Sequence, residues 1–364
     1  MKERVLLVST GGMDKSGGPS VLMTIVRGLS REYDFDILVS TDQEEYFDAE
    51  FKSFGGKIFR CPKLRTRFGP LNRVGELLRP IRLYFFTKSL IRRQGGYKVI
   101  HCNNDFDMAG CAAGAKAAGV PVRVCHTHKT WTPDSQFGLL TRLYRKRCRR
   151  TILRCATALV GCSPAANASI YGESAKTRVL WNAYDDGRFG WHPGDEAAPP
   201  LSIAQVGNLS DNKNQLFSLD VLKKLLDKRP DAAITFVGGD PAGYKARMQE
   251  RMTALGIESA VSYLPPDADI PALFSKCSVL LFPSKAEGFG IVLIEAQAMG
   301  LHCFASSAVP RETNVGGVEY LALSDGPDMW AEAVLKAADQ PKTPYDCSKF
   351  SLESFLNAIR EIYE

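Results

Sequence analysis

Residues 279–300 read Val-Leu-Leu-Phe-Pro-Ser-Lys-Ala-Glu-Gly-Phe-Gly-Ile-Val-Leu-Ile-Glu-Ala-Gln-Ala-Met-Gly. The first four residues are apolar and are followed by Pro-Ser, which is typical of a buried strand that ends at a turn. A loop with two glycines then leads into an apolar stretch that ends at Gly300, as a helix does. The segment therefore predicts a strand, a loop and a helix, with Glu287 and Glu295 on either side of the helix start.

The start of this helix is suited to binding a phosphate group. The first N–H groups of a helix have no partner within it, and the helix dipole places partial positive charge there. Gly288 and Gly290 carry no side chain that would hold a ligand away from the backbone. The segment predicts an anion site between two carboxylates; the alternative is an ordinary strand–loop–helix unit whose glutamates are solvated.

The run from Glu287 to Glu295 resembles the Glu-x7-Glu signature of retaining glycosyltransferases with the GT-B fold, of the family 4 type. The resemblance implies that Glu287 contacts the donor sugar and that Glu295 contacts the ribose. It also implies that the residues between them hold the diphosphate: Gly288, Phe289, Gly290, Ile291 and Val292. The resemblance extends over nearly the whole chain, although only this motif is specific by itself.

Length and composition favour a globular protein of more than one domain. The chain has 364 residues, of which 45% are hydrophobic and 24% are charged. No run reaches the roughly 18 apolar residues of a membrane span, and the short N-terminal apolar run is not typical of a signal peptide. The ten cysteines show neither Cys-x-x-Cys nor zinc-like spacing. We expect a cytoplasmic protein.

Strand and helix patterns alternate along the chain, which predicts α/β architecture with doubly wound parallel sheets. In the first half we expect strands at residues 5–9, 35–40, 57–60, 99–102, 123–126, 158–162 and 177–180. In the second half we expect strands at residues 201–206, 233–237, 261–264 and 279–282, with helices between them.

The predicted organisation is two Rossmann-like domains that face a cleft. The N-terminal, acceptor-side domain is expected over residues 1–186, followed by a linker rich in glycine and proline at 187–200. The nucleotide-sugar-binding domain is expected over residues 201–345. A C-terminal helix within 346–364 is expected to pack back on the first domain. Ligands of such sheets bind beyond the carboxyl ends of the strands.

Two further loops resemble elements that bind the donor in this family. The segment 9–19 contains four glycines and follows the first predicted strand, but it matches neither the dinucleotide nor the Walker A pattern. The resemblance implies that Gly17 and Gly18 let the backbone approach the diphosphate; a plain glycine loop is the alternative. Lys213 matches a phosphate-binding lysine, and Asn208 replaces an arginine of the family. An ammonium would offset the charge of the leaving diphosphate.

The strand and loop that begin at Val261 resemble the family segment whose backbone contacts the nucleotide base. Tyr263 and Leu264 are the residues expected to make that contact. Pro265 stands where a glycine is common, and it removes one N–H donor from the loop.

His126 and His128 follow a predicted strand in a chain that has only five histidines. The resemblance implies that His126 contacts the donor sugar; packing and metal binding are alternatives, although no nearby carboxylate or cysteine completes a metal set. Asp105 and Asp107 follow the preceding strand. With His128 they are expected on the acceptor side, and helix capping is the alternative for the two aspartates. We expect neither a metal nor another cofactor.

Positive charge is concentrated in the first half of a chain whose net charge is +6. Residues 60–93 carry ten Lys or Arg and one acid, and residues 139–155 carry seven and no acid. Apolar residues of the second segment recur at helical spacing: Leu140, Tyr144, Cys148, Ile152 and Cys155. A basic amphipathic helix of this kind favours an anionic membrane surface, with a solvated face as the alternative. Aromatic residues are sparse around the arginines, so we expect no nucleic acid.

The sequence thus predicts a metal-independent, retaining glycosyltransferase that uses a nucleotide-diphosphate sugar, with UDP favoured. The segment after Glu295 resembles enzymes of capsular and exopolysaccharide assembly, which implies a saccharide or lipid-linked acceptor at the inner face of the cell membrane. Three alternatives stay open: a sugar-nucleotide epimerase, a phosphorylase-like enzyme of the same fold, and a non-enzymatic, basic membrane-binding module.

Overall fold

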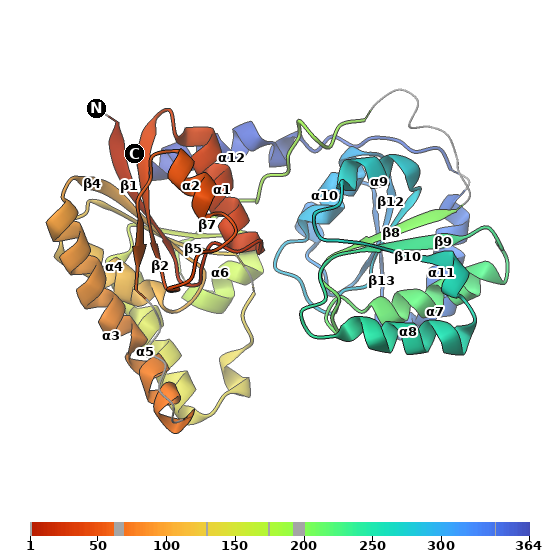
Figure 1. Ribbon diagram of the computed structural model, residues 1–364, viewed down its shortest axis with the longest axis horizontal. Coiled ribbons are helices and arrows are strands. Elements are labelled where there is room, and N and C mark those ends of the chain that lie inside the picture. Colours follow the sequence, from red (N-terminus) through yellow and green to blue (C-terminus); the bar gives the residue numbers. More distant parts are fainter. Residues whose placement is uncertain (1, 62–68, 129, 174, 192–200, 339) are drawn as a thin grey trace. The chain divides into compact units, whose positions relative to one another are not determined.

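The computed structural model describes residues 2–61, 69–128, 130–173, 175–191, 201–338 and 340–364 (Figure 1). Within residues 69–77 it describes the backbone only. The chain divides into two compact units, one formed by Met1–Asn182 with Glu353–Glu364 and the other by Ala183–Leu352. Each unit contains its own parallel sheet with helices on both faces. The predicted fold class is therefore confirmed.

The first unit is built on a seven-stranded parallel sheet with the strand order β3-β2-β1-β4-β5-β6-β7. The strands are β1 (Glu3–Ser9), β2 (Tyr33–Val39), β3 (Ile58–Arg60), β4 (Tyr97–Asn103), β5 (Val122–Thr127), β6 (Ala158–Gly161) and β7 (Arg178–Val179). Side chains on both faces of β1 are fully buried from Val5 to Val8. A strand covered on both faces reads as a continuous apolar run, which is why sequence patterns identify it.

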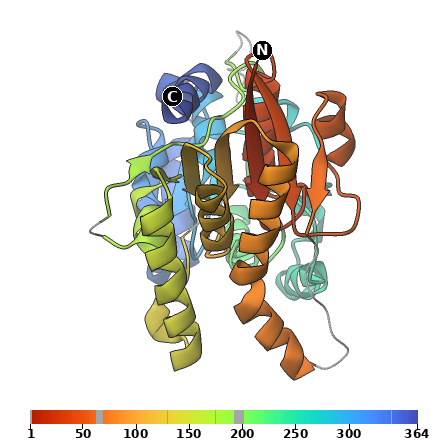
Figure 2. The same ribbon diagram turned by 90° about the vertical axis from the view of Figure 1, so that its left-hand side faces the viewer.

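Helices cover both faces of this sheet. They are α1 (Gly17–Leu29), α2 (Asp48–Ser53), α3 (Gly69–Gln94), α4 (Met108–Ala117), α5 (Leu139–Cys155), α6 (Pro164–Tyr171) and α12 (Leu352–Tyr363). On one face α4 lies between α3 and α5 (Figure 2). The C-terminal helix α12 buries apolar residues at helical spacing, from Phe355 to Tyr363. Its Leu356 lies directly over Gly28 of α1.

The second unit contains a six-stranded parallel sheet with the order β10-β9-β8-β11-β12-β13. The strands are β8 (Ser202–Val206), β9 (Ala233–Val237), β10 (Val261–Leu264), β11 (Val279–Phe282), β12 (His302–Ser306) and β13 (Val318–Leu321). The helices are α7 (Gln215–Leu226), α8 (Tyr244–Leu255), α9 (Ile270–Lys276), α10 (Ile291–Ala298) and α11 (Gly326–Ala338). Trp330 of α11 is fully buried in the core and packs edge-on against Phe217 of α7.

In each unit the strand order reverses beside the first strand of the sheet. The reversal lies between β1 and β4 in the first unit and between β8 and β11 in the second. The loops that leave these strands run in opposite directions, and ligands of doubly wound sheets bind at such points. In the second unit the loops are Gly207–Asn214 and Pro283–Gly290, which hold Lys213 and Glu287.

Several elements differ from the sequence-based expectations. Helix α1 begins at Gly17, so Gly17 and Gly18 lie in its first turn and not in a loop. The sequence pattern predicts a helix over residues 136–155, whereas α5 begins at Leu139. The patterns did not identify α2, β12, β13 and α11. Most of the predicted linker, residues 192–200, lies outside the described residues.

Candidate active site

The loops after β8 and β11 bring Lys213 and Glu287 together. The Lys213 Nζ atom lies 2.5 Å from Glu287 Oε1, and the two side chains are 23% and 13% exposed. The same Nζ lies 4.8 Å from the centre of the Phe282 ring. The lysine and the first glutamate of the predicted donor site therefore form a half-buried ion pair at the switch point of the sheet.

Backbone and amide contacts hold these two loops against each other. The Asn212 side chain donates a hydrogen bond to the Ala286 carbonyl at 2.9 Å, and the Lys285 N–H donates to the Asn212 carbonyl at 2.8 Å. Gln205 of β8 donates to the Lys213 carbonyl at 2.7 Å. These bonds hold the backbone of both loops in place, so little backbone entropy is left to lose when a ligand binds.

Asn208 and the glycines that follow β9 form the next part of this edge. Gly238 has φ +149°, and a Cβ atom there would overlap the carbonyl oxygen of Gly207, so only glycine allows the two loops to touch. The Asn208 Oδ1 atom accepts a hydrogen bond from the Gly239 N–H at 3.1 Å. Asn208 is exposed; its amide joins neighbouring loops and supplies no positive charge.

Helix α10 begins with an open N-terminus at the end of the β11 loop. Gly290 is the N-cap residue, with φ +90°, and no side chain caps the helix. The left-handed backbone explains the glycine at this position. Ile291 and Val292 are the first two residues of the helix. Glu287 thus belongs to the loop and Glu295 to the second turn of α10, with the helix start between them.

Glu295 has a strongly perturbed carboxyl group. Burial raises its pKa to about 7, while Arg188 lowers the pKa and Asp185 raises it further. The protonated and ionised forms are therefore both populated near pH 7. A carboxyl pKa raised by burial is common at functional sites, where the carboxylate has no partner within the protein and can bind a ligand instead.

Tyr263 and Leu264 end the edge strand β10. The Tyr263 ring packs 5.8 Å from the Phe236 ring in the core, and its hydroxyl lies 3.2 Å from the sulfur of Met252. Leu264 is 37% exposed. Its carbonyl accepts a hydrogen bond from the Gly238 N–H at 3.2 Å. The structure brings Leu264 beside the glycine loop, whereas the hydroxyl of Tyr263 is engaged away from it.

In the first unit, His126 and His128 belong to a buried cluster that also contains His101 and Tyr363. His126 Nδ1 lies 3.2 Å from His101 Nε2, and His101 Nδ1 lies 2.8 Å from the Tyr363 hydroxyl. His128 Nε2 lies 2.7 Å from Asn103 Oδ1. Sequence reasoning missed His101 and Tyr363. The sequence pattern could have indicated His101. This residue precedes Asn103 by two positions, so its side chain is on the same face of β4, and Asn103 pairs with His126 of β5.

Burial makes these imidazoles neutral near pH 7. It lowers the pKa of His101 to about 3 and that of His128 to about 4, and it lowers the pKa of His126 well below its usual value. Nearby histidines lower the pKa of His101 and His126 further. Among the described residues, no group of three or more His, Cys, Asp and Glu side chains is placed to hold a metal ion.

Asp105 and Asp107 stabilise the turn between β4 and α4. Asp107 is buried, and its carboxylate pairs with Arg79 at 2.7 Å and accepts a hydrogen bond from the Tyr144 hydroxyl at 3.2 Å. It occupies the N-cap position of α4 without a side-chain capping bond. Asp105 Oδ1 accepts the Asp107 N–H at 2.9 Å. These contacts favour a structural role for both aspartates. Asp107 forms an ion pair and Asp105 stabilises the turn, whereas neither side chain caps the helix as the alternative interpretation predicts.

Gly18 lies beside the β4–α4 turn, and Gly17 precedes it at the start of α1. A Cβ atom at position 18 would lie 2.8 Å from Asn104 Oδ1, whereas one at position 17 would meet nothing within 4 Å. Gly18 therefore leaves room for the neighbouring turn, and Gly17 leaves the start of α1 open.

Comparison with known proteins agrees with this geometry. Residues 195–353 match the family described as glycosyl transferases group 1, and residues 16–182 match the glycosyl transferase 4-like domain. EpsF of Bacillus subtilis, named as a glycosyltransferase, is 30% identical over 93% of this chain and 88% of its own length. The chain belongs to the group 1 glycosyltransferases. The predicted family is thus confirmed.

Solved structures show that this glycosyltransferase has the GT-B fold. HepE of Anabaena in complex with UDP-glucose is similar, with a TM-score of 0.75, 18% identity and 98% coverage of both chains. Sucrose-phosphate synthase of Thermosynechococcus elongatus has a TM-score of 0.74 and 17% identity, with 100% and 98% coverage of the two chains. At these identities the likeness concerns the fold alone.

Two arginines of the basic helix α5 are paired with an acidic residue within the first unit, although the sequence pattern predicts them on the exposed face of the helix. Arg145 is buried and pairs with Asp134 at 3.1 Å, and its guanidinium lies 4.1 Å from the centre of the Phe137 ring. Arg149 also pairs with Asp134 at 3.1 Å and donates to the Ile170 carbonyl. The expectation that these arginines are available to a membrane surface is therefore wrong, because a carboxylate and aromatic rings hold them inside the unit.

The remaining basic residues of α5 lie beside exposed leucines. Leu139, Leu140 and Leu143 are 69%, 72% and 54% exposed. The exposed basic residues of the same helix include Arg142, Lys146, Arg147 and Arg150. This combination of apolar and basic side chains is typical of an interfacial helix.

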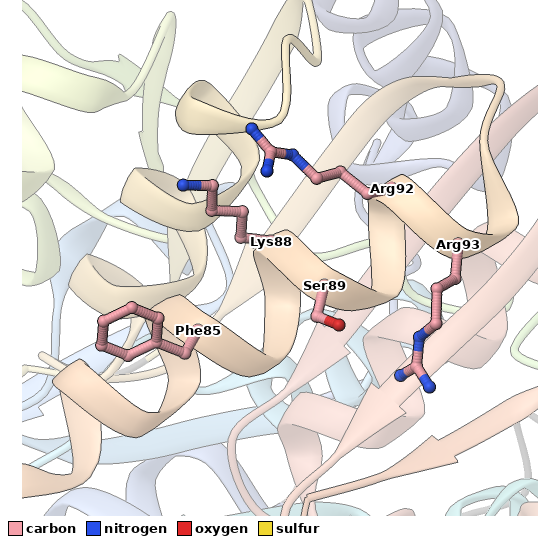
Figure 3. Close-up of a pocket in the computed structure, with 5 residues that line it drawn as sticks. All are labelled: Phe85, Lys88, Ser89, Arg92 and Arg93. Carbon is pink, nitrogen blue, oxygen red and sulfur yellow. The ribbon is translucent and has the colours of Figure 1, made fainter.

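Helix α3 presents a second patch of this kind. Phe85, which is 63% exposed, lies in line with Lys88 and Arg92 along the helix, and Arg93 points away from them (Figure 3). Lys63, Arg65 and Arg67 of the predicted basic segment lie outside the described residues. Among the described helices, none is long and apolar enough to cross a membrane.

Proposed function

We propose that this glycosyltransferase transfers a sugar, with retention of configuration, from a nucleotide-diphosphate donor to a saccharide or lipid-linked saccharide. The observation that carries the proposal is the Lys213–Glu287 pair beside the uncapped start of α10. A UDP-sugar is the favoured donor, since the structurally similar HepE was solved with UDP and with UDP-glucose. No metal takes part in the proposed reaction.

Each donor group has a proposed partner in the second unit. Lys213 and the amides of Ile291 and Val292 would bind the diphosphate, because a cation and a helix N-terminus both favour negative charge. Glu295 would accept hydrogen bonds from the ribose hydroxyls, and Glu287 would bind hydroxyls of the sugar. Leu264 would lie beside the base.

The proposed transfer step makes use of this arrangement of charge. The bond between the anomeric carbon and the diphosphate oxygen breaks, and its electron pair leaves with the diphosphate. The acceptor hydroxyl forms the new bond on the same face of the sugar, and its proton passes to the departing phosphate. Lys213 would stabilise the charge that develops on the leaving group. His126 is proposed to contact the sugar near the reacting carbon.

Nucleotide binding tests the donor assignment. We expect calorimetric titration without metal to show that UDP binds at least about 10-fold more tightly than GDP or ADP. A 10-fold difference in affinity corresponds to about 1.4 kcal/mol of binding free energy. Preference for GDP or ADP would overturn the UDP assignment alone. No heat with any of the three nucleotides would contradict the donor site.

We further propose that the enzyme acts in capsular or exopolysaccharide assembly, in the cytoplasm and at the inner face of the cell membrane. The similarity to EpsF and the exposed leucines and basic residues of α5 support this proposal. A lipid-linked acceptor is presented at such a surface, where each Lys or Arg contributes about 1 kcal/mol of attraction to anionic lipid.

Charge reversal on α5 tests the membrane proposal. Four of the exposed basic residues of α5 are replaced by glutamate: Arg142, Lys146, Arg147 and Arg150. We expect this variant to bind phosphatidylglycerol vesicles at least about 100-fold more weakly. UDP binding is expected to stay the same. The control replaces Lys223 and Lys224 of α7 by glutamate and is expected to leave vesicle binding unchanged. Vesicle binding that survives the α5 changes would exclude this surface.

A further inference from the structure

A row of hydrogen-bonded side chains runs from the C-terminal helix to His126. Tyr363, His101 and His126 are all fully buried in the first unit. The Tyr363 hydroxyl lies 2.8 Å from His101 Nδ1, and His101 Nε2 lies 3.2 Å from His126 Nδ1. The other ring nitrogen of His126, Nε2, is buried and has no hydrogen-bond partner among the described residues.

We propose that Tyr363, acting through His101, is a positioning residue that holds the proton of the neutral His126 ring on Nε2. His126 then presents an N–H donor to an oxygen of the bound sugar. This inference deepens the proposed function and rests on it for the identity of the ligand. The distribution of protons within the row does not depend on the ligand.

The number of available donors and acceptors determines which group donates in each hydrogen bond of the row. A buried tyrosine O–H requires an acceptor, and His101 Nδ1 is the partner that the described residues offer. If Tyr363 donates, His101 Nδ1 is unprotonated, so the proton of this neutral ring lies on Nε2. His101 Nε2–H then donates to His126 Nδ1, which places the His126 proton on Nε2.

The opposite direction leaves more groups unpaired. If His101 Nδ1–H donated to Tyr363, the tyrosine hydrogen would have no acceptor among the described residues, and His126 Nε2 would be an unpaired acceptor. Each buried unpaired group costs about 1–3 kcal/mol. In the proposed direction the single unpaired group is the N–H of His126 Nε2, which a sugar oxygen can satisfy.

Helix α12 is held in place by contacts that do not involve the Tyr363 hydroxyl. Arg360 forms a two-point ion pair with Glu32, with distances of 2.6 and 2.8 Å. The Tyr363 ring packs edge-on against Tyr33, 5.4 Å between ring centres. Replacing Tyr363 by phenylalanine keeps these contacts and removes only the hydroxyl. The variant therefore isolates the hydrogen bond from the docking of the helix.

Histidine tautomers provide the direct test. In the wild-type protein labelled with ¹⁵N-histidine, we expect His101 and His126 to show the Nε2–H tautomer; the chain has only five histidines to assign. In Tyr363→Phe we expect a mixture of tautomers at His126 and a turnover number about 5-fold lower, since one lost hydrogen bond is worth about 1 kcal/mol. The Kd for UDP is expected to be unchanged.

Tyr97→Phe is the matched control. Tyr97 is a buried tyrosine of the same sheet whose hydroxyl donates to Asp36 at 2.5 Å, away from the histidines. We expect it to leave the His126 tautomer and the turnover number unchanged. An equal effect of both variants would mean that the loss is a general result of removing a buried hydroxyl, and it would overturn the proposal.

The wild-type spectrum decides the proposal even where a variant fails to fold. A proton on Nδ1 of His126 would overturn it, as would an unchanged tautomer and turnover number in Tyr363→Phe. If the expected tautomers are found but no nucleotide binds, the proton arrangement stands and the proposed function fails. The two failures are therefore distinguishable.

Discussion

Replacing Lys213 by methionine is expected to lower kcat/KM for the nucleotide sugar by about 100- to 1,000-fold, the usual loss when one preorganised donor to a leaving group is removed. Methionine keeps an unbranched apolar side chain against Phe282 and removes the ammonium. The variant also leaves Glu287 without its partner at 2.5 Å, so a carboxylate faces the anionic diphosphate alone. Initial rates at varied donor concentration measure the effect.

The control for this variant is Lys223→Met on α7. The Lys223 side chain is 39% exposed and pairs with Asp227 one turn away. Surface pairs of this kind contribute about 0.5 kcal/mol or less. We expect its kcat/KM to equal that of the wild type. A Lys213→Met enzyme with the same kcat/KM as this control would contradict the role of Lys213.

A double variant tests whether the unpaired charge of Glu287 accounts for the effects of Lys213→Met. Combining Lys213→Met with Glu287→Gln removes both charges of the half-buried pair. We expect the double variant to regain the thermal stability that Lys213→Met loses, because no uncompensated charge remains. Its kcat/KM is expected to stay low. Recovery of kcat/KM would mean that the ammonium serves only to neutralise Glu287.

Glu295→Gln is expected to stabilise the protein above pH 7 and to weaken UDP binding. Burial raises the pKa of Glu295 to about 7 in the folded protein, from a usual value of 4.5. Folding therefore disfavours the ionised form of Glu295. This carboxyl group does not lower the free energy of unfolding below pH 4.5, lowers it increasingly as the pH rises, and has its full destabilising effect above pH 7. Glutamine avoids this cost, so we expect a gain of about 3 kcal/mol at pH 8 and almost none at pH 4.5.

The same substitution is expected to weaken UDP binding by about 10- to 100-fold, because hydrogen bonds to a charged group contribute about 1.5–3 kcal/mol. Thermal unfolding between pH 4.5 and 9, together with calorimetry, measures both effects. Glu250→Gln, at an exposed position on α8, is the control and is expected to change neither. A Glu295→Gln protein that is less stable than the wild type at pH 8 would mean that a partner holds the ionised carboxylate.

The sequence predicted those parts of the fold whose signals are local. The strand, loop and helix of residues 279–300 lie where the apolar run, the glycines and the helical spacing placed them. The same holds for most strands of both sheets. β12 and β13 were missed because short strands carry little periodicity, and a short apolar run does not distinguish a strand from a helix.

Periodicity also failed where a charged residue is buried. The pattern of α5 placed its arginines on a solvent-facing side, but Arg145 is buried by Asp134 and two phenylalanine rings. A helical wheel counts arginine as polar. It does not show that a carboxylate and aromatic faces from other segments can satisfy a guanidinium inside the protein.

The sequence by itself determined the family, the α/β class and the positions of Lys213, Glu287 and Glu295 in their loops and helix, because each depends on neighbours close in the chain. Only the tertiary structure decided that Lys213 meets Glu287 and that Tyr363 meets His101, which lies 262 residues away. Such contacts depend on the order of strands in a sheet and on where a terminal helix docks. Neither is encoded in local spacing, since both are set by burial of surfaces contributed by distant segments.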